Sequence, residues 1–289
     1  MTFGQILFPI DFSERSVAAA SHVDAIAMHF GSKVTLLNVV DLYRAYAAPG
    51  EFGVAYGYET DLESLKERLR VELDNFGKEH LPNACRGSYI EDGEPASTIV
   101  RFAEERGFDL IMMPTHGYGP FRRLLLGSVA AKVLHDAECP VWTSAHMETT
   151  PKTHVPYRNL MCAVDLGPRS LSLIQWSSRL AESMNARLRI VHAIPLLQPY
   201  SEYLADSRFE EDLRQDARRR IADLLREAGS HAPLCVAMGE PRDVVAEEAR
   251  RHAMDLVVIG RGCLKEKLGR LRTQSYGIIR EAPCPVISM

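Results

Sequence analysis

Short runs of apolar residues alternate with amphipathic segments along the whole chain. In the first half these runs lie near residues 5–10, 34–40, 86–91, 109–113 and 140–144. They are rich in Val, Ile and Leu and nearly continuous, which predicts strands that are buried on both faces. Between them, segments such as Ala96–Arg106 place small and apolar residues at helical spacing. Strands that alternate with helices predict a five-stranded parallel sheet with right-handed crossovers.

The second half of the chain repeats the pattern of the first. The run Ile-Leu-Phe-Pro-Ile-Asp-Phe at 6–12 has a counterpart, Leu-Met-Cys-Ala-Val-Asp-Leu, at 160–166. In both copies the aspartate of this run lies 27 positions before a polar residue in the next apolar run. Each copy later contains Gly-Glu-Pro and closes on Cys-Pro-Val. Several spacings preserved at once indicate a tandem duplication.

The duplication predicts two domains, residues 1–146 and 157–289, and a length of 289 residues fits that number. Residues 147–156 contain two prolines and three threonines without apolar periodicity, which predicts a linker. The segment 43–58 carries several aromatic residues and is longer than its counterpart in the second copy. Such a loop either serves as a partner surface or is a plain surface excursion, and the sequence leaves both open.

Composition narrows the class of protein. Apolar residues make up 46% and charged residues 25% of the chain, which excludes a disordered chain, a collagen and a coiled coil. The net charge of −4 gives no positive field that would recruit nucleic acid or an acidic membrane. No apolar run approaches the ~18 residues that cross a bilayer, and the first residues lack the pattern of a secretory signal. The six cysteines show neither a CxxC pair nor metal-ligand spacing, which predicts reduced thiols in a cytoplasmic protein.

Three features of the first copy are expected to meet at the carboxyl edge of its sheet, where open α/β sheets bind ligands. Asp11 follows the first strand, and Met-Pro-Thr-His-Gly at 113–117 follows the fourth. Gly127 and Ser128 then open a helix, with Ser128 placed as its N-cap. A glycine beside the free N–H groups of a helix N-terminus predicts an anion site, and phosphate is the favoured anion.

These motifs resemble those of the universal stress protein family. The resemblance rests on Pro-Ile-Asp-Phe-Ser at 9–13, Leu-Leu-Asn-Val-Val-Asp at 36–41, Gly-Glu-Pro at 93–95, Thr-His-Gly at 115–117 and Leu-Gly-Ser-Val at 126–129. ATP-binding members carry a glycine, two residues, a second glycine, nine residues and then Gly-Ser or Gly-Thr. Gly117 and the pair Gly127 and Ser128 keep the later part of this spacing, whereas Pro114 replaces the first glycine. Proline has no N–H, so any contact from that nitrogen is lost.

The resemblance covers almost the whole chain and implies a tandem member of the family. The implied fold is α/β, with two doubly wound five-stranded parallel sheets in a pseudo-twofold pair whose last strands lie side by side. The implied ligand is ATP, with or without Mg²⁺, in the first copy. The residues so assigned to the nucleotide are Pro9, Ile10, Asp11, Val39, Met113, His116, Gly117, Gly127, Ser128 and Val129. Asp11 would meet the adenosine part and Val39 the base, while residues 127–129 and Gly117 would hold the phosphates.

The second copy departs from the family pattern in the same place. Gly260, Arg261 and Gly262 follow its fourth strand, but Arg272 and Thr273 stand where the Gly-Ser pair is expected. An arginine does not let a phosphate approach the backbone as glycine does. We therefore expect ATP to bind the first copy and not the second.

The resemblance implies a stress-response regulatory protein that binds an adenine nucleotide without strong catalysis and acts through a homo-oligomer or a protein partner. His116 lies beside the predicted phosphate site, but no nucleophile with an orienting carboxylate accompanies it, which favours a positioning role. Two alternatives stay open. One is a scaffold that needs no nucleotide because Pro114 has closed the site. The other is a slow ATP hydrolase, which the lack of a water-activating carboxylate beside the phosphate motif disfavours.

Overall fold

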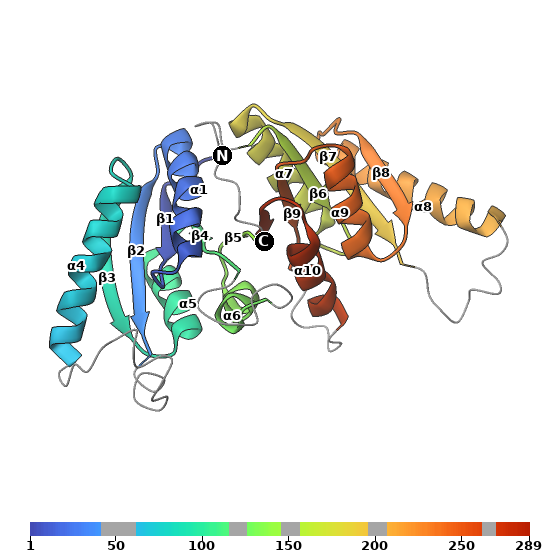
Figure 1. Cartoon of the computed structure of the whole chain (residues 1–289). Helices are drawn as coiled ribbons and strands as arrows, with labels where there is room; N and C mark the ends of the chain where they lie inside the picture. The colour runs from blue at the N-terminus through green and yellow to red at the C-terminus, as the bar shows by residue number, and fades with distance from the viewer. Residues whose placement is uncertain (42–61, 116–125, 146–156, 196–206, 262–269) are drawn as a thin grey trace. The chain divides into compact units, whose positions relative to one another are not determined.

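The computed structural model describes residues 1–41, 62–115, 126–145, 157–195, 207–261 and 270–289 (Figure 1). The chain divides into two compact units, which we call the first unit (residues 2–143) and the second unit (residues 157–289). The predicted linker at 147–156 and the aromatic segment 43–58 lie outside the described residues. The predicted pairing of the last strands of the two copies stays a prediction.

The first unit is built on five parallel strands. Its elements are β1 (Gln5–Pro9), α1 (Glu14–Phe30), β2 (Lys33–Val40), α4 (Leu62–His80), β3 (Cys85–Asp92), α5 (Pro95–Arg106), β4 (Leu110–Met112), α6 (Ser128–Asp136) and β5 (Val141–Thr143). The strand order is β3-β2-β1-β4-β5, and all neighbouring strands run parallel. The order reverses at β1, so the sheet is doubly wound, as the sequence predicts.

The second unit repeats this arrangement (Figure 1, yellow to red). Its elements are β6 (Asn159–Ala163), α7 (Ser170–Met184), β7 (Arg187–Ile194), α8 (Ser207–Glu227), β8 (Leu234–Met238), α9 (Pro241–Arg251), β9 (Leu256–Ile259), α10 (Arg270–Glu281) and β10 (Val286–Ser288). The strand order β8-β7-β6-β9-β10 is again entirely parallel. The predicted fold class, two five-stranded doubly wound α/β sheets, is confirmed.

The continuous apolar runs form the centre of each sheet. In β1 the side chains of Ile6, Leu7 and Phe8 are fully buried, and in β9 Leu256, Val257 and Val258 are as well. Right-handed crossovers place α1 and α4 on one face of the first sheet and α5 and α6 on the other. Because both faces of the sheet are covered, the strands need no polar face.

The repeated Gly-Glu-Pro motif forms the turn between an outer strand and the following helix. Gly93 has a φ of +139°, and a Cβ built on it would lie 2.8 Å from Oγ1 of Thr98. Its N–H donates to the carbonyl of Val40 over 3.1 Å. Gly239 has a φ of +142° and donates to the carbonyl of Ile194 over 3.0 Å. Only glycine suits this backbone conformation, which explains why both copies contain the motif.

Among the described helices, none is both long and apolar enough to cross a membrane.

Candidate functional site

Three strands of the first unit end next to one another at the edge of the sheet where the candidate residues were predicted. β1 lies between β2 and β4. The N–H of Gly127 donates to the carbonyl of Thr115 over 2.9 Å, which ties the start of α6 to the segment that follows β4. The structure therefore brings Asp11, Val39 and the start of α6 to one edge of the sheet.

The predicted nucleotide residues differ in how far solvent reaches them. Three of them are buried, namely Pro9, Ile10 and Met113. Four are half-buried, namely Asp11, Val39, Gly127 and Val129, and Ser128 is exposed. His116 and Gly117 lie outside the described residues. A ligand at this edge can therefore touch Asp11, Val39 and the first residues of α6. The buried residues pack beneath these and support their positions.

Asp11 forms a tight turn between β1 and α1. Its Oδ1 accepts the N–H of Ser13 at 3.0 Å and the hydroxyl of Ser16 at 2.7 Å. Phe12, between them, has a φ of +59°, which is rare for a bulky residue. The side-chain bonds to Asp11 hold the backbone in this conformation. Oδ1 thus has a structural role, and in the described chain no group bonds Oδ2, so that oxygen is the one a ligand can use.

The second unit repeats this turn in detail. Oδ1 of Asp165 accepts the N–H of Gly167 at 2.8 Å and the hydroxyl of Ser170 at 3.2 Å. Leu166 has a φ of +60°, matching Phe12. The turn therefore persists in a copy whose phosphate motif has changed. An aspartate at this position indicates the turn and does not by itself indicate a nucleotide.

The polar residue 27 positions after each aspartate also supports the turn. Asn38 is buried, and its Nδ2 donates to the carbonyl of Ile10 over 2.8 Å. His192 is buried in the second unit, and its Nδ1 bonds the carbonyl of Val164 at 2.7 Å. Burial lowers the pKa of His192, against the smaller raising effect of that bond. His192 is thus a core histidine that bonds the backbone. The role of Asn38 was not predicted, although the repeated spacing carried the signal.

The start of α6 offers a set of uncommitted backbone donors. The structure places Gly127 at the N-cap, with φ −59° and ψ +143°, so the prediction of Ser128 as N-cap is wrong by one residue. Both residue types cap helices well, and local sequence does not separate them. No side chain of a described residue caps this end, and the first intrahelical bond joins the N–H of Ala131 to the carbonyl of Gly127 at 2.8 Å. The N–H groups of Ser128, Val129 and Ala130 precede that bond and have no partner in the helix.

A cation lies beside this helix on its first turns. Nζ of Lys132 in α6 donates to Oε2 of Glu94 at 2.9 Å. The carboxylate of Glu94 also accepts the N–H groups of Ala96 at 3.3 Å and Ser97 at 2.9 Å, which caps α5. Burial acts to raise the pKa of Glu94, but the bonds from Lys132 and Ser97 outweigh it and lower the pKa to about 2. The pair thus joins the start of α5 to α6.

The second unit has lost this arrangement. α10 begins at Arg270, whereas counting back from the Cys-Pro that follows each helix aligns Thr273 with Ser128. The helix therefore continues for about one more turn at its start. The N–H groups of Gln274 and Ser275, at the positions of Val129 and Ala130, fall within the helix and are used by it.

Two side chains complete the difference between the units. The hydroxyl of Ser275 reaches the carbonyl of Gly260 at 3.5 Å, so it faces the end of β9. Gly277 stands at the position of Lys132, and a Cβ there would lie 3.2 Å from Cβ of Arg242. Glu240, at the position of Glu94, makes no capping bond. In the described chain, the second unit has neither the free amides nor the cation of the first.

Pro114 lies two residues after the end of β4. The preceding N–H, that of Met113, donates to the carbonyl of Trp142 at 3.1 Å and belongs to the sheet. Thr115 is buried, and its carbonyl holds Gly127. Proline therefore occupies the second position after the strand without breaking a bond of the sheet. The substitution of the family's glycine changes the edge of the site and leaves the fold intact.

Comparison with known proteins shows the family. The model of the universal stress protein family matches residues 2–144 and 156–288, so the chain belongs to this family. A universal stress protein of Methanocaldococcus jannaschii is 37% identical over 141 residues, which cover 48% of this chain and 80% of that protein. A solved universal stress protein of Archaeoglobus fulgidus is 18% identical, covers 99% of this chain and 96% of its own, and has a TM-score of 0.69. A universal stress protein solved in complex with cAMP is 18% identical over 51% of this chain, covers 100% of its own, and has a TM-score of 0.36.

Proposed function

We propose that the first unit binds ATP at the edge formed by Asp11, Val39 and the start of α6. The protein then acts as a cytoplasmic regulator whose surface reports nucleotide occupancy to another copy or to a protein partner, without strong catalysis. The second unit binds no ATP. The observation that carries this proposal is the set of uncommitted N–H groups at 128–130, which has no counterpart among the described residues of the second unit.

These N–H groups suit a phosphate. They lie together at the positive end of the helix dipole, which favours an anion by roughly 0.3–1 kcal/mol even at exposed sites. Gly127 has no side chain to block a close approach. Lys132 adds a positive charge on the same helix, although Glu94 holds it in the structure described here. The family resemblance adds Gly117 to the residues that would hold the phosphates.

The adenosine part would lie toward β1 and β2. Asp11 keeps Oδ2 available at the end of β1, and a carboxylate oxygen accepts hydrogen bonds from ribose hydroxyls. Val39 is half-buried on β2 and offers apolar contact to the base. The turn around Asp11 fixes the carboxylate before a ligand arrives, which lowers the cost of ordering it on binding.

Mg²⁺ would accompany the triphosphate. Within the described ranges no three His, Cys, Asp or Glu side chains gather in a way that could hold a metal ion. Mg²⁺ in nucleotide sites is held mainly by phosphate oxygens and water, so it does not need such a group. When bound, the ion would neutralise charge on the triphosphate.

Calorimetric titration of the full chain with ATP tests the proposal. Gly127→Arg should abolish binding because the new side chain covers the amides, and the φ of −59° accepts any L-residue without strain. Arg272→Ala, at the aligned position of the second unit, is the matched control and should leave binding intact. ATP, ADP and cAMP are titrated with and without Mg²⁺, and any copurified nucleotide is identified by mass.

Four results would contradict parts of the proposal. Unchanged affinity in Gly127→Arg would show that the ligand binds elsewhere. Loss of binding in Arg272→Ala would place it in the second unit. Absence of any nucleotide binding would support the scaffold alternative, and steady release of phosphate that Gly127→Arg stops would support the hydrolase.

A further inference from the structure

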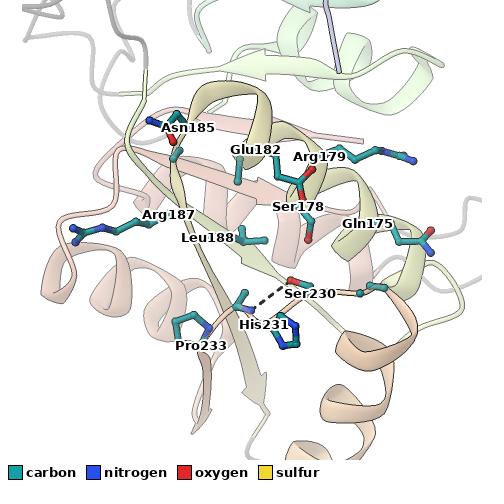
Figure 2. A pocket seen from close by; sticks show the side chains of 15 residues that line it. Gln175, Ser178, Arg179, Glu182, Asn185, Arg187, Leu188, Ser230, His231 and Pro233 are labelled. Atoms are coloured by element: carbon teal, nitrogen blue, oxygen red, sulfur yellow. Dashed lines mark hydrogen bonds between the residues drawn. The ribbon is translucent and has the colours of Figure 1, made fainter.

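A groove of about 950 Å³ lies in the second unit, at the ends of β7 and β8 where these strands begin (Figure 2). One wall is the second half of α7 and the residue that caps it, from Gln175 to Asn185. The other wall is the turn between α8 and β8, from Ala228 to Pro233. Leu188 of β7 lies between the two walls. The carboxyl ends of the strands, where nucleotides bind in this fold, are at the opposite edge of the sheet.

The groove exposes part of a strand edge. The N–H of Ile190 donates to the carbonyl of Pro233 at 2.9 Å, and the ladder between β7 and β8 begins at the pair Ile190 and Leu234. Alternate residues of a strand direct their N–H and C=O to the same neighbour, so those of Leu188 face the same side as those of Ile190. Proline at 233 has no N–H to give. In the described chain nothing bonds the N–H or the C=O of Leu188.

The first unit closes the same edge. Val34 stands at the position of Leu188, and its N–H donates to the carbonyl of Ala84 at 3.0 Å. β3 pairs with Val34 from Cys85 onward. When the glycine turns after β3 and β8 are aligned, β8 begins three positions later than β3. The second unit therefore lacks the first residues of an outer strand, and the groove lies in their place.

Further polar groups line the groove around Leu188. Oγ of Ser178 on the α7 wall is buried and has no hydrogen-bond partner among the described residues. Ser230 on the opposite wall accepts the N–H of Ala232 at 3.4 Å. Figure 2 shows Ser178, Leu188 and Ser230 around the middle of the groove. Hydroxyls and a free backbone N–H and C=O together match the donors and acceptors of a peptide chain.

The charge of the groove is positive. Its ionised side chains are Arg179, Arg187 and Glu182. Neither arginine forms an ion pair with a described residue. In the first unit the corresponding positions are Ala25 and Lys33, so one of the two cations is particular to the second unit. An acidic ligand is therefore favoured over a basic one.

We propose that this groove binds an extended acidic segment of a partner protein, which lies beside Leu188 in place of the missing start of β8. Such strand addition uses backbone hydrogen bonds for affinity and side-chain contacts for specificity. Here the backbone of Leu188 and the hydroxyl of Ser178 contact the peptide backbone. Arg179 and Arg187 contact its carboxylates. The site is independent of ATP binding in the first unit.

Amide hydrogen exchange of the full chain tests the geometry first. In the free protein the Leu188 amide should exchange at least about tenfold faster than that of Val34, because only the latter is hydrogen-bonded. Equal protection of the two amides would overturn the proposal. Protection of Leu188 that rises with protein concentration would assign the groove to a second copy of the chain and would also overturn it.

Binding is then measured with a fluorescein-labelled probe peptide, Thr-Val-Glu-Val-Glu-Val-Thr. The bound peptide should protect the Leu188 amide from exchange. Two control peptides, one with Lys in place of Glu and one N-methylated at alternate residues, should each bind at least about tenfold more weakly, as expected for the loss of one or two bonds. Arg187→Glu and Ala232→Trp should both abolish binding, the first by charge and the second by filling the groove. Lys33→Glu is the matched control and should have no effect. Equal binding of the acidic and basic peptides, or equal effects of Arg187→Glu and Lys33→Glu, would refute the site.

Discussion

The two units share a fold and differ at the start of one helix. α6 begins with a glycine cap and uncommitted amides, whereas α10 begins about one turn earlier and uses the aligned amides within the helix. The turns formed by Asp11 and Asp165 are the same in both units. Features that both units keep are therefore required by the fold. Features that only the first unit keeps, Gly127 and Lys132 among them, are the ones on which the proposed ligand site depends.

This comparison changes how strongly each motif supports a nucleotide site. Asp11 and the Gly-Glu-Pro turn belong to the family pattern, yet each has a sufficient structural reason in the second unit. The glycine before α6 has no such reason, because its φ of −59° does not require glycine. The ligand that we propose would approach the backbone here, and that approach would account for a residue without a side chain. The case for a nucleotide therefore rests on Gly127 more than on Asp11.

The largest expected difference between the units is in their response to acid. His22 of α1 packs on Trp142 with ring centroids 5.2 Å apart, and its Nδ1 is buried without a partner among the described residues. Burial lowers the pKa of His22 to about 4. Trp176, which does not ionise, stands at the aligned position of the second unit. Acid should therefore destabilise the first unit more than the second, in which burial also lowers the pKa of His192.

The sign follows from proton binding. Below the ordinary histidine pKa of 6.5, His22 binds a proton in the unfolded chain but stays neutral in the folded unit. The free energy of unfolding therefore falls between pH 6.5 and about 4, by at most about 3 kcal/mol. The chain has two tryptophans, so Trp176→Phe leaves Trp142 as the reporter of the first unit in urea unfolding. Adding His22→Phe should flatten the pH dependence. Exchanging the exposed His29 for Gln is the control, and an equal flattening there would contradict the assignment.

The second prediction separates the two roles of the aspartates. Asp11→Ala and Asp165→Ala each remove an acceptor of two bonds and should cost about 1–3 kcal/mol of unfolding free energy. Asp11→Asn and Asp165→Asn keep the acceptor oxygen and should be nearly as stable as the parent protein. Only Asp11→Asn should weaken ATP, by about tenfold, because it removes the charge toward the ribose.

Denaturant unfolding and ATP calorimetry on the four variants measure both effects. Equal weakening of ATP by Asp165→Asn would show that the second unit contributes to the site. A stable Asp11→Ala would show that the turn does not depend on the side chain.

Sequence alone predicted most of the fold because the strands are nearly continuous apolar runs. The run near 34–40 became Lys33–Val40 and that near 86–91 became Cys85–Asp92. The start of α10 at Arg270 was not predicted, because the alignment with Gly127 and Ser128 pointed to Arg272 and Thr273, although Gly269 directly precedes Arg270 in the sequence. The positive φ of Phe12 was also missed, since it is imposed by bonds to Asp11 and not by the residue itself. The contact of Lys132 with Glu94 joins residues 38 positions apart, and local pattern does not reveal it.

The smallest expected effect concerns Pro114, where the first unit itself departs from the ATP-binding pattern of the family. A glycine there would restore one backbone N–H at the edge of the site. A neutral hydrogen bond of this kind is worth roughly 0.5–1.5 kcal/mol, so Pro114→Gly should tighten ATP binding a few-fold to about tenfold. The same change should lower stability by about 0.4–1 kcal/mol because glycine gains freedom in the unfolded chain.

Pro114→Ala separates the two effects, because alanine restores the N–H with less added freedom. Both variants should therefore tighten ATP in calorimetry, and alanine should cost less stability. Gly260→Pro makes the corresponding change after β9 and should leave ATP binding unaltered, since the described part of the second unit has no counterpart of the free amides at 128–130. Weaker binding in both Pro114 variants would mean that the proline shapes the edge for the ligand. Pro114 would then be a residue that improves the contact with the nucleotide, and its presence in place of the family's glycine would not be the loss of a contact.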